Sequence, residues 1–120
     1  MNERNIIFTL DAYKWDHESL YREGFEGSYA HQVFRNGSVF PYHVWFSLSA
    51  IVQRWLTTPI TQKDVDEAKA VAAEAFGDVE CFNWRSWQRI VDEFGGKLPI
   101  QIKALPEGTI VNTRVPLVTV

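Results

Sequence analysis

Hydrophobic residues in the middle of the chain recur at helical spacing. Residues 40–56 place their apolar side chains on one face of a helix, and Pro59 ends that pattern. A second helix is predicted to begin after Thr61, which can cap it together with Asp64, and to end at Gly77. Two of the three central segments are therefore expected to be helices over about 40–56 and 62–76.

The third central helix is bounded by clear signals at both ends. Asn83 is a suitable N-cap, and Gly95-Gly96 terminate the apolar pattern. The side expected to be buried consists of Trp84, Trp87, Ile90, Val91 and Phe94.

The two ends of the chain predict mainly extended structure. Residues 5–10 form a short apolar run expected to be a strand or an extended lead-in. Residues 12–24 are expected to be a helix because Tyr13, His17 and Leu20 recur at intervals of four and three. The remaining expectations are a strand within 27–37 that ends in the Asn36-Gly37 turn, period-two alternation over 97–105, a turn at 106–108, and strands at 109–111 and 116–120.

A helical middle flanked by short antiparallel strands is an α+β arrangement. The length of 120 residues suits one domain, taken here as 1–120. The run "PLVTV" at the end of the sequence is apolar throughout, so it is expected either to pair within this domain or to lead into further polypeptide.

Composition narrows the classes of function. The net charge is −3, whereas general nucleic-acid binders are usually basic, so we expect neither nucleic acid nor a membrane surface as a partner. No apolar stretch approaches the roughly 20 residues that cross a bilayer. Cys81 is the single cysteine and can form no internal disulfide, which favours a cytoplasmic location. The three histidines match no standard zinc spacing, so no metal site is expected.

Two clusters of polar and aromatic residues carry possible chemistry. In the first, Tyr13 offers a flat face for stacking and Asp11 can accept a hydrogen bond. In the second, Arg35 precedes a turn and could bind a phosphate with its planar guanidinium. The structural alternative is that Tyr13 covers the core, Asp11 caps the first helix and Arg35 is solvated. Residue types alone favour this alternative, because most polar loop residues bind no ligand.

The order of several segments resembles the N-terminal domain of the nicotinamide phosphoribosyltransferases of NAD salvage. The pattern D-x-Y-K-x-x-H of Asp11, Tyr13, Lys14 and His17 is similar to the family's N-terminal signature. Similar segments follow in the same order: "SYAHQVFR", "WFSLSAIVQRWL", "ITQKDVDEAKAVAAEAFG" and, most specifically, "LPIQIKALPEG". The resemblance covers essentially the whole chain, and it implies the N-terminal domain of a type II phosphoribosyltransferase without its barrel.

The resemblance implies specific roles. Family enzymes join nicotinamide to 5-phosphoribosyl-1-pyrophosphate, with Mg²⁺ and, where the reaction is coupled to it, ATP; no cofactor is expected to be held by this chain alone. They are homodimers that share the active site between subunits. By position, Tyr13 matches the tyrosine that stacks on nicotinamide, Asp11 an acidic residue beside that ring, and Arg35 the arginine facing the sugar phosphate. No catalytic residue is expected here.

Some features differ from the family pattern. The lysine-rich loop that follows the family's arginine is short here, and His31 stands where aromatic residues are usual. The family's barrel, which supplies the aspartate that reads the carboxamide and the histidine phosphorylated during ATP coupling, is not in this sequence. Whether the base is nicotinamide or nicotinate therefore stays open.

Two hypotheses follow. The chain is either a substrate-orienting segment that needs a barrel in the same or another polypeptide, within a homodimer or a complex with a barrel-containing chain, or an interaction module that docks onto a homologous full-length enzyme. The first is favoured by the joint presence of Asp11, Tyr13 and Arg35.

Overall fold

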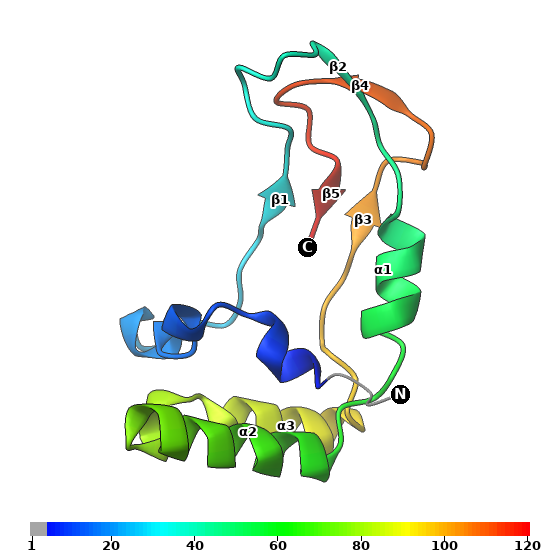
Figure 1. Cartoon of the computed structure of the whole chain (residues 1–120). Coiled ribbons are helices and arrows are strands. Elements are labelled where there is room, and N and C mark those ends of the chain that lie inside the picture. Colours follow the sequence, from blue (N-terminus) through cyan, green and yellow to red (C-terminus); the bar gives the residue numbers. More distant parts are fainter. Residues whose placement is uncertain (1–4) are drawn as a thin grey trace. The chain divides into compact units, whose positions relative to one another are not determined.

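The computed structural model describes residues 5–120 and divides them into two compact units. The first contains residues 5–25 and 55–99, and the second contains residues 26–54 and 100–120. Each unit has its own buried apolar cluster. The elements, named in Figure 1, are α helices and short antiparallel strands, so the predicted α+β class is confirmed.

Two helices form the base of the first unit. Helix α2 spans Gln62–Phe76 and α3 spans Trp84–Phe94, and the two pack side by side (Figure 1). Thr61 and Asp64 form a reciprocal capping box at the start of α2, and Gly77 ends it at φ 75°. The Asn83 side chain accepts a hydrogen bond from the backbone N–H of Ser86. These predicted boundaries are confirmed because the sequence carries local capping signals at each end.

The core of this unit collects side chains from the N-terminal segment and from both sides of α2. Its buried members are Ile7, Trp15, Ile60, Val65, Ala68, Ala72 and Phe82. The small alanines of α2 let neighbouring segments approach its axis closely. Trp15 lies beside Phe82, with ring centroids 4.9 Å apart, and beside Phe76 at 6.0 Å.

The strand or extended lead-in predicted for residues 5–10 is wrong. The structure has a 3-10 helix, η1, over Ile6–Thr9. The carboxamide of Asn5 explains the difference: its Oδ1 accepts from the N–H of Ile7, and its Nδ2 donates to the carbonyl of Asp64 at 2.7 Å. When a side chain accepts a hydrogen bond from the backbone N–H two residues later, a turn is favoured over an extended strand.

The continuous helix predicted for residues 12–24 is also wrong. Two short 3-10 helices replace it, η2 at Ala12–Lys14 and η3 at His17–Leu20, separated by a turn. The stripe of Tyr13, His17 and Leu20 on which the helix prediction was based is not buried: Tyr13 is 68% and Leu20 76% exposed. Trp15, which lies off that stripe, is the buried residue. Burying this larger side chain decides the path of the segment.

Two small sheets build the second unit. Strands β1 (His31–Gln32), β5 (Val118–Thr119) and β3 (Lys103–Ala104) form one antiparallel sheet in the order β1-β5-β3, with β5 in the centre (Figure 1). The apolar run at 116–120 therefore pairs on both sides within the chain, which was one of the two predicted alternatives. Strands β2 (Tyr42–Val44) and β4 (Ile110–Asn112) form a separate antiparallel pair.

The helix predicted for residues 40–56 is only partly present. Strand β2 occupies its first part, and α1 spans Leu48–Trp55. Ser47 separates them with a positive φ of 84°, a backbone conformation that a continuous helix excludes. The carboxylate of Glu107 accepts a hydrogen bond from the N–H of Ser49 at 2.7 Å, which stabilises the free amide end of α1 and lowers the pKa of Glu107.

The alternation predicted over residues 97–105 produces only the two-residue strand β3. Leu98 packs against the core of the first unit, whereas Ile102 packs against that of the second. The apolar positions therefore serve two cores rather than one face of one strand. The turn at 106–108 and the strand at 109–111 are confirmed, the latter displaced by one residue.

The second core contains Trp45, Val111, Leu117 and Val118, with Phe34 and Leu105 packed against it. The indole N–H of Trp45 donates to the carbonyl of Leu105 at 3.0 Å. No helix among the described residues is long and apolar enough to cross a membrane. The prediction of one domain over 1–120 and the cytoplasmic location are not tested by these features.

Candidate functional site

The first predicted cluster lies on η2, where Asp11, Tyr13 and Lys14 are brought together. The Nζ of Lys14 lies 2.9 Å from Oδ2 of Asp11 and 5.5 Å from the centre of the Tyr13 ring. His17 completes the group, with its ring centroid 5.7 Å from that of Tyr13. One 3-10 turn accounts for the pairing, because side chains three residues apart are aligned in that helix.

The Asp11–Lys14 pair sets the charge of the cluster. A hydrogen bond and the charge of Lys14 hold the pKa of Asp11 below its ordinary value, and the same contact raises the pKa of Lys14. Asp11 stands at the N-cap position of η2, but its side chain makes no capping hydrogen bond. The alternative that Asp11 serves as a helix cap is therefore wrong.

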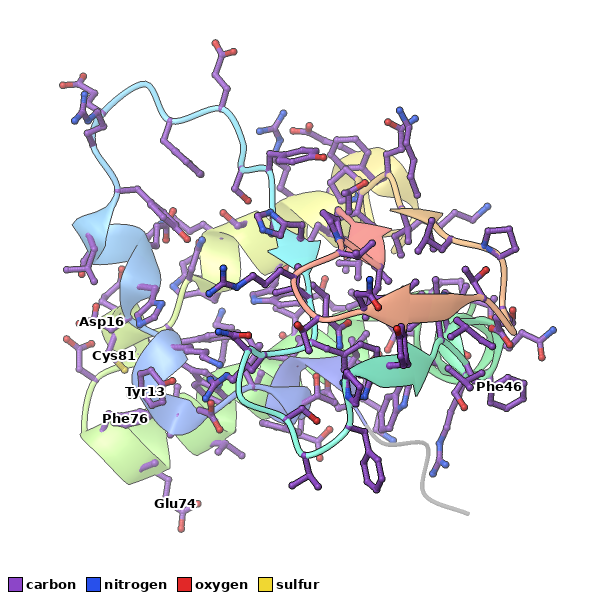
Figure 2. All side chains as sticks on the ribbon, turned by 90° about the horizontal axis from the view of Figure 1, so that it is seen from above. Tyr13, Asp16, Phe46, Glu74, Phe76 and Cys81 are labelled. Carbon is purple, nitrogen blue, oxygen red and sulfur yellow. The ribbon has the colours of Figure 1, made fainter. Side chains whose placement is uncertain are left out.

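The Tyr13 side chain is exposed, and the alternative that it covers the core is also wrong. Figure 2 shows it on the coil of residues 12–14, in the same unit as Asp16 and Cys81. A phenol ring that is 68% exposed and lies beside a carboxylate and an ammonium group can offer one face to a planar ligand.

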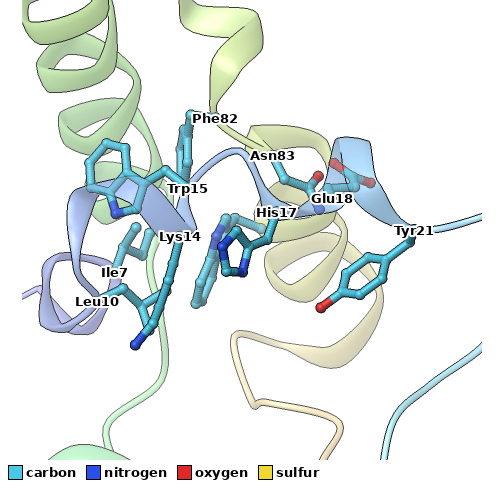
Figure 3. A pocket seen from close by; sticks show the side chains of 10 residues that line it. Ile7, Leu10, Lys14, Trp15, His17, Glu18, Tyr21, Phe82 and Asn83 are labelled. Atoms are coloured by element: carbon cyan, nitrogen blue, oxygen red, sulfur yellow. The ribbon is translucent and has the colours of Figure 1, made fainter.

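A shallow pocket of about 170 Å³ adjoins this cluster in the first unit (Figure 3). Its apolar lining includes Ile7, Trp15, Phe82 and Trp87, and its polar lining includes Lys14, His17, Glu18 and Asn83. Asp11 and Tyr13 do not line it. Sequence reasoning missed this pocket because residues 12–24 were predicted to be a helix, which would point Trp15 elsewhere.

Cys81 also belongs to the first unit and is half-buried. It is the last residue of the short 3-10 turn that Asp78 caps. Its thiol donates to the carbonyl of Asp78 at 2.9 Å. Burial and, to a smaller extent, the carboxylates of Asp78 and Asp16 raise the pKa of the thiol. A thiol held in its neutral form is a poor nucleophile, so the geometry gives Cys81 no catalytic role.

The second predicted cluster lies in the second unit. Arg35 is exposed and directly precedes the Asn36-Gly37 turn, where Gly37 has φ 88°. The residue before it, Phe34, is half-buried and stacks on His43 with ring centroids 4.0 Å apart. The carbonyl of Phe34 accepts a hydrogen bond from the N–H of Arg114 at 3.1 Å. The base of the Arg35 turn is thus attached to the core of its unit.

Asp11 and Tyr13 therefore form one group, and Arg35 belongs to the other unit. That all three serve one binding site stays a prediction. Within residues 5–120, no group of three His, Cys, Asp or Glu side chains is arranged to hold a metal ion.

Comparison with known proteins decides the family. The family of the nicotinamide phosphoribosyltransferase N-terminal domain matches residues 5–102, which is most of the chain. The chain belongs to this family. The resemblance inferred from the D-x-Y-K-x-x-H pattern and the later segments is confirmed, and the matched range includes Asp11, Tyr13 and Arg35.

Two curated relatives share nearly the full length of the chain. A nicotinamide phosphoribosyltransferase of Xanthomonas campestris pv. campestris is 39% identical over 116 residues, 97% of this chain and 24% of the relative. A nicotinamide phosphoribosyltransferase of Acinetobacter baylyi is 30% identical over 133 aligned positions, 97% of this chain and 25% of the relative. The chain thus spans about a quarter of the length of the curated relatives that it matches.

Proposed function

We propose that this chain is the substrate-orienting N-terminal segment of a nicotinamide phosphoribosyltransferase-like enzyme. The complete enzyme would join nicotinamide to phosphoribosyl pyrophosphate and release pyrophosphate. The observation that carries the proposal is the exposed Tyr13 ring beside the Asp11–Lys14 pair, in a chain of this family. An aromatic face with a charged hydrogen-bonding group at its edge suits a planar amide-bearing base.

The proposed roles are binding and orientation. Tyr13 would hold the base in line with the anomeric carbon of the sugar, and Asp11 would lie beside it; Arg35 would contact the phosphate side of the sugar substrate. Positioning of this kind can supply a large part of the acceleration when two substrates must meet in line. Neither a stacking phenol nor an arginine is a general acid or base at neutral pH, so the bond exchange requires groups from elsewhere.

The remaining three quarters of such an enzyme would supply those groups. We propose that this barrel acts in the same or another polypeptide, with the site shared across a homodimer or a complex. Mg²⁺ would enter with phosphoribosyl pyrophosphate, and ATP where the reaction is coupled to it. We propose that the protein ligands of Mg²⁺ belong to the barrel.

The test combines the purified chain with the Xanthomonas campestris relative lacking the quarter that this chain matches. Nicotinamide mononucleotide is measured by liquid chromatography. We expect no product from the chain alone and product from the pair. Turnover by the chain alone would show that no barrel is needed, and an inactive pair of folded proteins would count against the proposal.

The site is tested in the same reconstituted enzyme. Replacing Tyr13 by Ala should raise the KM for nicotinamide about 5-fold, since a stacked aromatic pair contributes on the order of 1 kcal/mol, while Tyr13→Phe should preserve it. Tyr29→Ala is the matched control, because Tyr29 is also exposed but lies in the second unit. An unchanged KM in Tyr13→Ala would refute the stacking role.

A second candidate function rests on a different observation. The outer face of the β2–β4 pair exposes Tyr42, Val44 and Ile110, and Phe46 projects beyond it (Figure 2). An uncharged apolar face of this kind favours contact with another polypeptide. The alternative is therefore a module that docks onto a homologous full-length enzyme. It predicts that the chain changes the activity of the intact relative and restores none to the shortened one.

A further inference from the structure

We infer that His43 is a positioning residue for Arg35, acting through the ring of Phe34. The inference rests on the proposed function, because it concerns how the chain presents Arg35 to the phosphate of the sugar substrate. All of its parts lie in the second unit, and His43 itself is not proposed to touch a substrate.

The contact between the two rings is close and nearly parallel. The ring centroids of Phe34 and His43 are 4.0 Å apart, with 22° between the ring planes. This separation is shorter than the roughly 4.5–7 Å typical of aromatic pairs, so the two rings are in direct face-to-face contact. The stack joins the segment after β1 to strand β2, which are separated in sequence by the Arg35 turn.

His43 is a fixed support. It is the central residue of β2 and pairs with Val111 of β4, whose side chain is buried in the core of the unit. A strand residue between two paired neighbours has little freedom, and its side chain projects toward the same side as that of its directly opposed partner. The strand pairing thus fixes the backbone that carries the imidazole, and the imidazole in turn restrains the ring of Phe34.

Phe34 is the last restrained residue before Arg35. Its ring packs on the core cluster and on His43, and its carbonyl accepts from the N–H of Arg114. Arg35 follows, and then the Asn36-Gly37 turn reverses the chain. An exposed arginine loses considerable rotamer freedom on binding a phosphate, so restraining the residue beside it reduces the part of that loss that arises from the backbone.

The imidazole contributes its ring surface to this contact. Its Nε2 is buried and has no hydrogen-bond partner among the described residues. A buried nitrogen without a partner is unfavourable, so Nε2 gives no reason to prefer a histidine over another flat ring. Phenylalanine at position 43 should therefore preserve the positioning, whereas an aliphatic residue should abolish it.

The kinetic test uses the full chain with the shortened relative described above. His43→Val retains a residue that favours strands but removes the ring, and His43→Phe keeps a ring. We expect His43→Val to raise the KM for phosphoribosyl pyrophosphate about 5-fold, with the KM for nicotinamide and kcat within about twofold of wild type. His43→Phe should behave as wild type, and so should the control His31→Val, at an exposed histidine of β1.

Two results would overturn the inference. One is a His43→Val enzyme whose KM for phosphoribosyl pyrophosphate is unchanged; the other is a His43→Phe enzyme as impaired as His43→Val. If His43→Val does not give the circular dichroism spectrum of the wild type, Phe34→Leu replaces it, because this change removes the other ring and keeps an apolar side chain in the core. The same selective rise in KM is then expected.

Hydrogen exchange separates this inference from the proposed function. The N–H of Arg114, bonded to the carbonyl of Phe34, should exchange about 5-fold faster in His43→Val and unchanged in His43→Phe, measured by NMR on the isolated chain. If exchange follows this pattern while the reconstituted enzyme is inactive, the support of the Arg35 turn stands and the proposed function fails. Unchanged exchange in His43→Val would refute the support itself.

Discussion

The ammonium group of Lys14 forms an ion pair with the carboxylate of Asp11 at 2.9 Å, across one turn of η2. Both side chains are substantially exposed, at 40% and 62%, so the pair does little for stability. Its effect is local: it keeps a negative and a positive charge beside the exposed Tyr13 ring, which is the group proposed to receive the base.

The ion pair predicts the titration of Asp11. Its folded-state pKa lies below the ordinary 3.8, so the small stabilisation is complete above that pH and is lost as the pH falls through the lower folded value. Replacing Lys14 by Met should move the Asp11 pKa back toward 3.8, measured by NMR titration of the carboxyl carbon. Lys63→Met, on α2, should leave it unchanged. An Asp11 pKa that does not move in Lys14→Met would show that the pair does not form in solution.

Exposure predicts that Tyr13 contributes little to folding. Tyr13→Ala should change the free energy of unfolding by less than about 0.5 kcal/mol, as for other exposed sites. Trp15→Ala, two residues away and 9% exposed, should cost about 3–5 kcal/mol because it leaves a cavity beside Phe82. Urea unfolding followed by circular dichroism measures both. Similar losses in the two variants would contradict the observed burial.

Gly96 is predicted to be irreplaceable, in contrast to its neighbour. It has φ 78°, and a Cβ there would lie 2.2 Å from the carbonyl oxygen of Ile60, whereas Gly95 has φ 59° and open space. Gly95→Ala should cost about 1 kcal/mol, and Gly96→Ala about 3 kcal/mol or more. The thermal unfolding midpoint of each variant tests this. Equal midpoints would mean that residues 60 and 96 are not in contact.

The side chain of Asn5 is predicted to stabilise the packing of η1 on α2 through its hydrogen bonds. Its side chain donates to the Asp64 carbonyl and accepts from the N–H of Ile7, and the residue is 8% exposed. Asn5→Ala should cost about 1–3 kcal/mol, since buried polar groups lose their partners. Asn112→Ala, at an exposed position of β4, should be nearly neutral. Equal free energies of unfolding for the two variants would rule out this role.

The helices that were predicted correctly share one property: their signals are local. Thr61 with Asp64 begins α2 and Gly77 ends it, while Asn83 and Gly95 bound α3. The capping hydrogen bonds at these ends join residues within about one and a half turns of one another, so the sequence alone carries the information. The strong period of α3 adds to this, because one face is apolar over its whole length.

The candidate site was predicted only in part for the opposite reason. Sequence pattern identified Asp11, Tyr13 and Arg35 as candidates, but it placed Tyr13 on a continuous helix that does not form. Three contacts that shape the structure join residues far apart in the sequence or on different elements. They are the hydrogen bond from Asn5 to α2, the packing of Trp15 on Phe82, and the Phe34–His43 stack. The periodicity of apolar residues along the sequence does not predict such contacts.

By itself, the sequence determined the α+β class, the bounds of α2 and α3, and the family. It also named Asp11, Tyr13 and Arg35 as candidate binding residues, and their roles stay predictions. Only the tertiary structure decided that residues 5–20 coil as 3-10 turns, that Trp15 is buried while Tyr13 is exposed, and that β5 lies between β1 and β3. The physical reason is range. Caps and helical periods act within a few residues, whereas the choice of which aromatic ring to bury depends on the neighbours that the whole unit brings together.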